Sequence, residues 1–207
     1  MRISTARLPE LSWRTAIIAL LLASLVVPLI IGYDFFFPYV APRNFFFRVV
    51  VEVGAAALVL ALSFGRKSLD LRSEPIFWSL VTFLAAASVS ALLSPAPTHS
   101  FFGDFERMGG VWAWFHLVLF FLLLRTLRDE DWSWILNGAL VVSLVVGAIA
   151  VGQHFGLGTG AHSAEPVAVA STSTFGNSGL LAAYLLMNVA LASYLAATSM
   201  PYRLLYF

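Results

Sequence analysis

Acidic and basic side chains occur together in one short segment that lies between two long apolar runs. Within residues 100–110 (SFFGDFERMGG), Asp104, Glu106 and Arg107 fall within four positions and have glycines on both sides. A guanidinium group suits phosphate oxygens, and glycines let the backbone approach a ligand closely. The segment is therefore a candidate anion-binding loop. The competing interpretation is a solvated loop whose mixed charges bind no ligand.

A second charged pair lies inside an apolar run. Arg48 and Glu52 are four residues apart, so a helix places them on one face, where they can pair. An ionised residue in hydrocarbon costs about 2.5–3.5 kcal/mol on insertion scales, so the pair either offsets this cost internally or faces a polar cavity. Alternatively, the two residues pack helices near the interface, and the Arg48 side chain extends outward to water.

The start of the last apolar run is a third candidate. Residues 171–179 (STSTFGNSG) are small and polar, and a helix that begins after Asn177 or Ser178 would be capped by that side chain. Its first backbone N–H groups would point to the outer surface and could hold an anion, which makes Asn177 a candidate binding residue. Ordinary capping without a ligand is the alternative.

The histidines do not predict a metal centre. His99, His154 and His162 have neither HxxxH nor HExxH spacing, and the chain has no cysteine to supply a thiolate ligand. His116 lies inside an apolar run, where we expect it to pack helices as a hydrogen-bond donor rather than to relay protons. We therefore expect no metal and no cofactor.

The composition is that of an integral membrane protein. Of the 207 residues, 60% are hydrophobic and 11% are charged, and the mean hydropathy is +0.87. Soluble domains carry about 25% charged residues. The twelve Lys and Arg residues are scattered among the loops and form no basic face, which argues against nucleic-acid binding. Without cysteine, a disulfide and a cysteine nucleophile are excluded.

Six apolar runs are long enough to cross a hydrocarbon layer of about 30 Å as helices. We therefore predict an all-α polytopic membrane bundle, with residues 1–207 forming a single transmembrane domain. Pro28 lies inside the first run and is expected to kink it. That run is longer than the core of a secretory signal, so we expect it to be retained as a span. The predicted spans lie near 15–33, 45–64, 76–94, 111–127, 133–152 and 178–198.

Basic residues orient these spans, because Lys and Arg in short loops stay on the cytoplasmic side. With the N-terminus inside, nine of the twelve basic residues lie inside. Arg43, Arg48 and Arg107 then lie outside, against this bias, and an anionic substrate is one candidate reason. The nine inside residues are Arg2, Arg7, Arg14, Arg66, Lys67, Arg72, Arg125, Arg128 and Arg203.

Aromatic residues fall near the predicted interfaces, where amphipathic rings gather. Trp112 and Trp114 begin the fourth span directly after the charged loop, and they either belong to this aromatic belt or form a stacking platform for a sugar ring. The other belt residues are Trp13, Tyr33, Tyr39, Trp78, Trp132, Trp134 and Tyr202.

Three stretches, in this order, resemble the N-terminal half of the O-antigen ligase and O-antigen polymerase family. They are PRNFFFRVVVE at 42–52, FFGDFERMGGVWAWFHLVLFF at 101–121 and STFGNSGLLAAYLL at 173–186. Each is a weak pattern alone, but their order and spacing cover most of the chain. The positions that match the family patterns are Arg48, Glu52, Phe105, Glu106, Arg107, Met108, Gly110, Thr174, Gly176, Asn177, Leu181, Ala182 and Tyr184.

The resemblance implies a multispanning transferase of the bacterial inner membrane with a GT-C-like helical fold. Its donor would be a glycan linked to undecaprenyl diphosphate on the periplasmic side, and its acceptor a glycolipid such as lipid A–core, a growing glycan or a protein hydroxyl. Such enzymes require no metal. The family's large periplasmic loop, with further arginines and a histidine, would follow the spans seen here, so the resemblance predicts that this chain is part of a longer protein.

These observations lead to one hypothesis and one alternative. Arg107 would bind diphosphate oxygens, and Arg48 would be a second clamp oriented by Glu52. The general base for the acceptor hydroxyl would be Glu106, Asp104 or a histidine beyond this chain, which the sequence does not rank. The alternative is a transporter or channel subunit in which Arg48 and Glu52 line a translocation path, although the sequence has no matching inverted halves.

Overall fold

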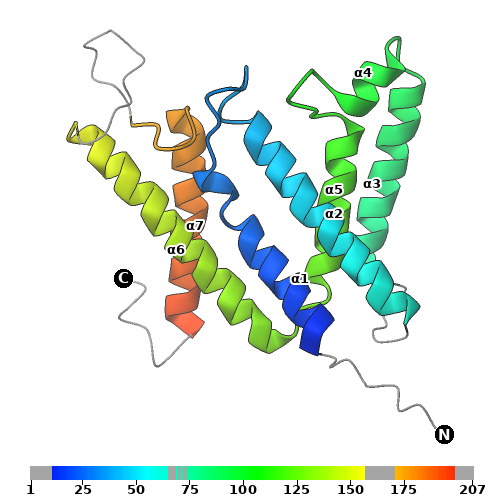
Figure 1. Cartoon of the computed structure of the whole chain (residues 1–207), viewed down its shortest axis with the longest axis horizontal. Coiled ribbons are helices and arrows are strands. Elements are labelled where there is room, and N and C mark those ends of the chain that lie inside the picture. Colours follow the sequence, from blue (N-terminus) through cyan, green and yellow to red (C-terminus); the bar gives the residue numbers. More distant parts are fainter. Residues whose placement is uncertain (1–10, 65–68, 70, 72–73, 157–170, 199–207) are drawn as a thin grey trace, which may run out of the picture.

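The computed structural model describes residues 11–64, 69, 71, 74–156 and 171–198. These residues form seven α-helices and one 3-10 helix, and no strand occurs among them. The prediction of an all-helical fold is therefore confirmed. In chain order (Figure 1), the helices are α1 (Leu11–Ser24), η1 (Val27–Leu29), α2 (Ala41–Ser63), α3 (Pro75–Leu92), α4 (Pro97–Phe102), α5 (Val111–Leu124), α6 (Asp129–His154) and α7 (Ser178–Thr198).

Four of these helices are long and apolar enough to cross a membrane, namely α2, α3, α6 and α7. The segment Trp13–Leu29 and helix α5 are apolar but shorter. Each of the six predicted apolar runs thus contains a helix, and four of these helices reach the length of a full span in the part of the chain that the structure describes. The protein has the architecture of a helical membrane bundle.

Among the described helices, α1, α2 and α6 begin about four residues before the predicted spans, whereas α3, α5 and α7 begin where they were predicted to within one residue. α2 begins at Ala41 rather than near residue 45, because Pro42 occupies its first turn, where the missing N–H group is not needed. Pro97 likewise stands in the first turn of α4, whereas Pro75 begins α3 next to its predicted start at residue 76. Helix α4 lies between two predicted spans, where the sequence indicated only a loop. These prolines start helices here instead of marking loops.

The first predicted span, 15–33, is interrupted rather than kinked. Its α-helix ends at Ser24, and the 3-10 turn η1 that follows contains Pro28. The carbonyl oxygen of Pro28 accepts hydrogen bonds from Arg43 Nη2 at 2.8 Å and from Thr174 Oγ1 at 2.6 Å. Residues from elsewhere in the chain therefore satisfy the backbone at this break, as an apolar environment requires.

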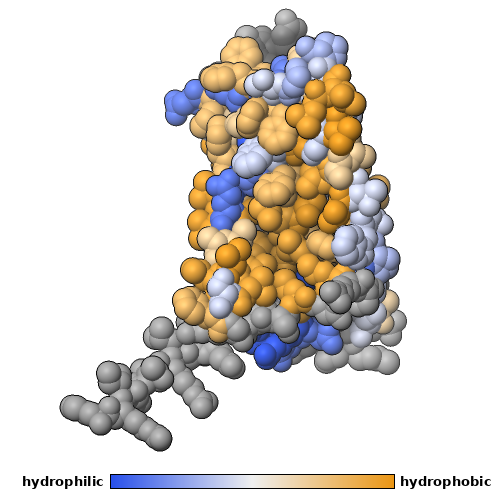
Figure 2. All heavy atoms as spheres, turned by 90° about the vertical axis from the view of Figure 1, so that its right-hand side faces the viewer, coloured by the Kyte–Doolittle hydropathy of each residue, from blue (hydrophilic) through white to orange (hydrophobic). Residues whose placement is uncertain are grey.

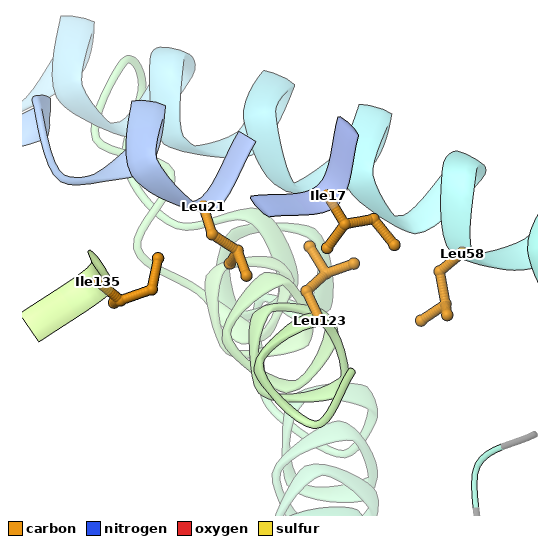
Figure 3. Close-up of a cluster of buried hydrophobic side chains, with 5 residues drawn as sticks. All are labelled: Ile17, Leu21, Leu58, Leu123 and Ile135. Atoms are coloured by element: carbon orange, nitrogen blue, oxygen red, sulfur yellow. The ribbon is translucent and has the colours of Figure 1, made fainter. Parts of the chain in front are cut away.

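Helix α1 joins two groups of helices. It packs against α2 and α5 and also against α6, while α3 and α4 pack against α5, and α7 packs against α6. In Figure 1, α6 and α7 accordingly lie to the left of α1, and α5 and α3 lie to its right. A cluster of buried side chains from four helices fills this junction (Figure 3): Ile17, Leu21, Leu58, Leu123 and Ile135.

Polar side chains gather at the two ends of the bundle. At the lower end in Figure 1, Arg14 Nη2 bonds to Asp131 Oδ1 at 2.7 Å, and Arg125 pairs with Glu74. At the upper end, which we call the loop end, lie the segments that precede α2, α5 and α7. The face drawn in Figure 2 is mostly hydrophobic over its middle and more hydrophilic toward its ends. This distribution suits a protein with an apolar layer around its middle.

A close approach of α2 and α5 generates a prediction about stability. A Cβ atom at Gly54 would lie 2.6 Å from Leu123 Cδ1, so the side chain of Leu123 occupies the space that a larger residue needs. We predict that Gly54→Val lowers the free energy of unfolding by about 1–3 kcal/mol, because overpacking forces neighbouring side chains out of their rotamers. The measurement is the thermal unfolding midpoint of the detergent-solubilised protein.

Gly147→Val is the matched control for this prediction. Gly147 also lies within an apolar helix, but a Cβ atom there would meet Leu185 Cδ2 at 3.9 Å, an ordinary contact. Its unfolding midpoint should stay close to that of the wild-type protein. Equal midpoints for the two valine variants would contradict the tight crossing of α2 and α5.

Candidate anion-binding site at the loop end

Residues 103–110, which we call the charged loop, connect α4 to α5 and close on themselves at two glycines. Gly103 has φ +82, and a Cβ atom there would lie 2.5 Å from the backbone nitrogen of Gly109. A Cβ atom at Gly110 would lie 2.4 Å from the carbonyl oxygen of Phe101. Only glycine fits such close backbone approaches. The glycines thus close the charged loop on itself.

The backbone of the charged loop is held in an uncommon conformation. Glu106 and Met108 have φ values of 62 and 48, in the left-handed region that residues other than glycine rarely adopt. Such residues persist where the surrounding structure fixes them, and they cluster at functional sites. Here the fixing contacts come from α2, since Asn44 Nδ2 donates to the carbonyl oxygen of Arg107 at 2.8 Å and Arg48 binds Met108.

Arg48 is buried and points to the charged loop. Its Nη1 lies 3.1 Å from Met108 Sδ, and its Nη2 donates to the Met108 carbonyl oxygen. The carboxylate of Glu52 turns to α5 instead, where its Oε1 lies 2.9 Å from His116 Nε2. The spacing of Arg48 and Glu52 predicted that the two side chains can pair. Among the described residues no such ion pair forms, because each side chain has a partner on a different segment.

The two carboxylates of the charged loop also have partners. Glu106 Oε2 accepts a hydrogen bond from the backbone N–H of Phe37 at 3.1 Å. Asp104 Oδ1 lies 3.0 Å from His99 Nε2, and both of these side chains are exposed. Neither carboxylate forms an ion pair with Arg107 in the part of the chain that the structure describes. The negative charges of the loop therefore do not neutralise its arginine by direct contact.

Arg107 is exposed, and its guanidinium carbon lies 4.3 Å from the centroid of the Phe37 ring. Within residues 11–64, 69, 71, 74–156 and 171–198, no carboxylate or carbonyl oxygen accepts a hydrogen bond from this guanidinium. A guanidinium held against a ring keeps its in-plane N–H donors available for another group. The structure thus presents Arg107 as an open donor for an anion.

Arg43, by contrast, is used within the protein. Its guanidinium donates to the carbonyl oxygens of Pro28 at 2.8 Å, of Ile30 at 3.0 Å and of Thr174, and it lies 4.7 Å from the centroid of the Phe175 ring. The sequence grouped Arg43, Arg48 and Arg107 as three exceptions to the charge bias. Their contacts differ, because Arg43 and Arg48 bind backbone carbonyls of the protein and Arg107 does not.

Asn177 caps α7, as the sequence predicted. Its Oδ1 accepts a hydrogen bond from the backbone N–H of Leu180 at 3.1 Å. The preceding Gly176 has φ +66 and lies against Tyr39, where a Cβ atom would be 2.3 Å from a ring carbon. Tyr39 and Phe37 belong to the same segment, so the segment before α2 touches both the start of α7 and the charged loop. Capping alone accounts for the contacts of Asn177.

The tryptophans that follow the charged loop pack against rings of the protein. Trp112 stacks on Phe115 with a centroid distance of 5.6 Å and meets the edge of the His116 ring at 4.9 Å. Trp114 meets Phe83 on α3 at 5.2 Å. The contact of Trp114 joins α5 to α3, and Trp112 also lies near the rings of Phe101 and Phe102 on α4.

Sequence reasoning missed the contact between Glu52 and His116. The available signal was an ionisable residue inside each of two apolar runs, 45–64 and 111–127, since such residues need a polar partner in hydrocarbon. No cluster of three or more potential metal ligands occurs among the described residues. His162, which the sequence analysis considered, lies outside those residues.

Comparison with protein-family models, with curated proteins and with solved structures finds no match for this chain. The class of the protein therefore follows from its own features. In the part of the chain that the structure describes, it is all-helical, has four helices that are long and apolar enough to span a membrane, and carries the charged loop at one end of the bundle.

The role of Arg48 generates a prediction about the charged loop. The chain has no cysteine, so a spin label attached at Phe105→Cys is the only label on it. The Phe105 side chain is exposed, so the label can be attached there. We predict that Arg48→Met increases the mobility of this label, since it removes both contacts with Met108. The measurement is the electron paramagnetic resonance line shape of the labelled protein.

Arg128→Met provides the control, because Arg128 is exposed and lies at the opposite end of the bundle. It should leave the line shape unchanged. An unchanged line shape in the Arg48→Met variant would mean that other contacts fix the charged loop.

Proposed function

We propose that this protein is part of a membrane glycosyltransferase of the O-antigen ligase or polymerase type. It would transfer or extend a glycan carried on undecaprenyl diphosphate at the outer side of the bacterial cytoplasmic membrane. The observation that carries the proposal is the exposed guanidinium of Arg107, which stacks on Phe37 and has no carboxylate partner among the described residues. A diphosphate supplies the negative oxygens that such a donor binds.

The proposed reaction gives Arg107 a defined task. An acceptor hydroxyl oxygen attacks the anomeric carbon of the glycan, the bond from that carbon to the diphosphate oxygen breaks, and negative charge grows on the leaving diphosphate. A fixed cation at that oxygen stabilises the transition state more than the ground state. Phe37 and the contacts of the charged loop hold the guanidinium in place before the substrate arrives, so little reorganisation is needed.

The proton of the acceptor hydroxyl also needs a destination. His99 and Asp104 both precede Arg107 in the sequence, and both side chains are exposed. His99 Nε2 lies 3.0 Å from Asp104 Oδ1. An imidazole that a carboxylate orients, and whose charged form that carboxylate stabilises, is a common proton acceptor in group transfer. We assign this role to the pair because Glu106, the other carboxylate of the charged loop, accepts a hydrogen bond from the protein backbone.

The proposed membrane orientation places the loop end outside and the N-terminus in the cytoplasm. Arg14, Arg125 and Arg128 lie at the end opposite the charged loop, in agreement with the rule that places basic residues inside. The proposal includes all six apolar runs as spans of a GT-C-like bundle. The exposed Arg107 then meets the aqueous side on which the lipid-linked glycan is presented.

The transporter alternative has weaker support. It requires Arg48 and Glu52 to line a path for a solute, but Arg48 is buried against Met108 and Glu52 binds His116. A guanidinium that already binds a backbone carbonyl is poorly suited to exchange partners with a passing solute. We therefore favour the transferase.

The first test of this function is the activity of arginine variants. We predict that Arg107→Ala in the full-length protein lowers glycan transfer by about 10²–10³-fold, the effect of losing one donor to a developing negative charge. Arg107→Lys should retain part of the activity, because it keeps the charge but loses the planar donors. The measurement is surface-glycan synthesis in a deletion strain complemented at equal expression.

Arg128→Ala is the control for a general effect of removing a cation, since Arg128 is exposed at the opposite end. It should support wild-type glycan levels. If Arg107→Ala does the same, the assignment of this residue to the substrate site is wrong.

The second test is the sidedness of the charged loop. We predict that Phe105→Cys in the full-length protein reacts with a membrane-impermeant thiol reagent added to intact cells from which the outer barrier has been removed. A cysteine at Arg128→Cys should react only after the cytoplasmic membrane is opened. The reverse pattern would place the charged loop in the cytosol, away from the proposed lipid-linked donor.

A further inference from the structure

Glu52 and His116 form a polar contact in the apolar part of the bundle. The His116 ring is almost fully buried, at 1% exposed, and its two nitrogens have different partners. Nδ1 lies 2.8 Å from the carbonyl oxygen of Trp112, one helical turn earlier on α5, and Nε2 lies 2.9 Å from Glu52 Oε1 on α2. Both ring nitrogens therefore face oxygen atoms.

The chemistry of these oxygens determines how many protons the pair holds. A carbonyl oxygen only accepts, so Nδ1 of His116 must carry a hydrogen and donate it to Trp112. The contact between Nε2 and Glu52 Oε1 then needs one further proton, either on the imidazole or on the carboxyl group. In the first case the pair is an imidazolium and a carboxylate, and in the second both groups are neutral. The net charge of the pair is zero in both cases.

Few ionisable side chains lie on the helices that carry the pair, and the nearest of them is Arg48. Glu52 is the central residue of the 23 in α2, which leaves a run of about 16 Å of helix on either side of it. α5 contains no ionisable residue besides His116, and α3, which packs on α5, contains none. On α2, Arg48 lies one helical turn from Glu52, and its guanidinium binds Met108. The contact thus lies halfway along α2 and in the second turn of α5, among apolar residues of both helices.

The two partners differ in how they can be reached. The Glu52 side chain is 55% exposed, and its neighbours Val49 and Val53 on the same face of α2 are exposed as well, whereas the ring of His116 is enclosed. An ionised carboxylate at the centre of a membrane helix costs about 2.5–3.5 kcal/mol on insertion scales. Protonation of Glu52 removes this cost, and His116 can take the same proton when Glu52 releases it.

We propose that Glu52 and His116 form a proton-binding site within the membrane. One proton is shared between Glu52 Oε1 and His116 Nε2, and Glu52 is the exposed partner through which a protonated carboxyl group can be reached. His116 is the enclosed partner, since its second nitrogen is occupied by Trp112. This site is separate from the anion site at Arg107, and it stands whether or not the protein transfers glycans.

The test uses a hydrophobic carbodiimide, which reacts with protonated carboxyl groups in apolar surroundings. The carboxyl proton moves to a carbodiimide nitrogen, the carboxyl oxygen bonds to the central carbon, and rearrangement to an N-acylurea retains the whole reagent without a leaving group. We expect mass spectrometry of the full-length protein labelled in membranes to find this adduct on Glu52. Glu52→Gln should lose the adduct, and its amide can still donate to His116 Nε2 and preserve the fold.

His116→Phe tests whether the proton is shared. Without the imidazole, the proton stays on Glu52, and labelling of Glu52 should become faster than in the wild-type protein. An equal rate would show that His116 does not hold the proton, and the absence of a Glu52 adduct in the wild-type protein would show that Glu52 does not carry it. Either result overturns the proposal.

A measurement on the wild-type fold covers the case in which His116→Phe does not fold. The infrared difference spectrum between the wild-type protein and Glu52→Gln should contain a carboxyl band that shifts when the sample is exchanged into D2O. A spectrum with only an ionised carboxylate band, unaffected by D2O, would mean that the proton remains on His116 and that Glu52 does not exchange it. That result would also overturn the proposal.

Discussion

Hydrogen bonds from the guanidinium groups of Arg43 and Arg48 to backbone carbonyls hold the loop end of this protein together. Arg43 binds three carbonyl oxygens near η1 and before α7, and Arg48 binds that of Met108 in the charged loop. Irregular backbone at the end of an apolar bundle needs such donors, because lipid supplies none. Both arginines stand on the first turns of α2, which makes this helix the frame on which the neighbouring segments are fixed.

The need for polar partners also distinguishes Arg43 and Arg48, which bind the protein itself, from Arg107, which is available to a ligand. A charge that the protein has already paired costs little to keep, whereas a cation without a partner must lie where water or a ligand reaches it. Arg107 meets this condition because the two acidic side chains beside it bind Phe37 and His99 instead. Farther into the apolar layer, the contact of Glu52 with His116 solves the problem differently, since one shared proton keeps the pair neutral. Each of these charged groups thus has either a partner in the protein or a position that water or a ligand can reach.

The sequence anticipated the apolar helices well and their ends less well. Hydrophobic runs reveal a span because hydrocarbon tolerates little else, and the start of α7 agrees because Asn177 is a local cap. The sequence pattern wrongly predicts loops at Pro42 and Pro97, since proline is tolerated in a first helical turn and ends a helix elsewhere. The sequence predicted a kink at Pro28, but the full break after Ser24 depends on donors from Arg43 and Thr174 that are distant in sequence.

The sequence by itself determined the helical membrane class of this protein, the positions of its apolar runs and the concentration of charge in one loop. These features depend on composition and on neighbours within a few residues, and the sequence contains both directly. Tertiary structure decided the partners of the charged groups: Arg48 meets Met108 and Glu52 meets His116, contacts that span 60 and 64 positions. Helical spacing allowed Arg48 and Glu52 to pair, but the packing of α5 and the charged loop against α2 offered each of them another partner.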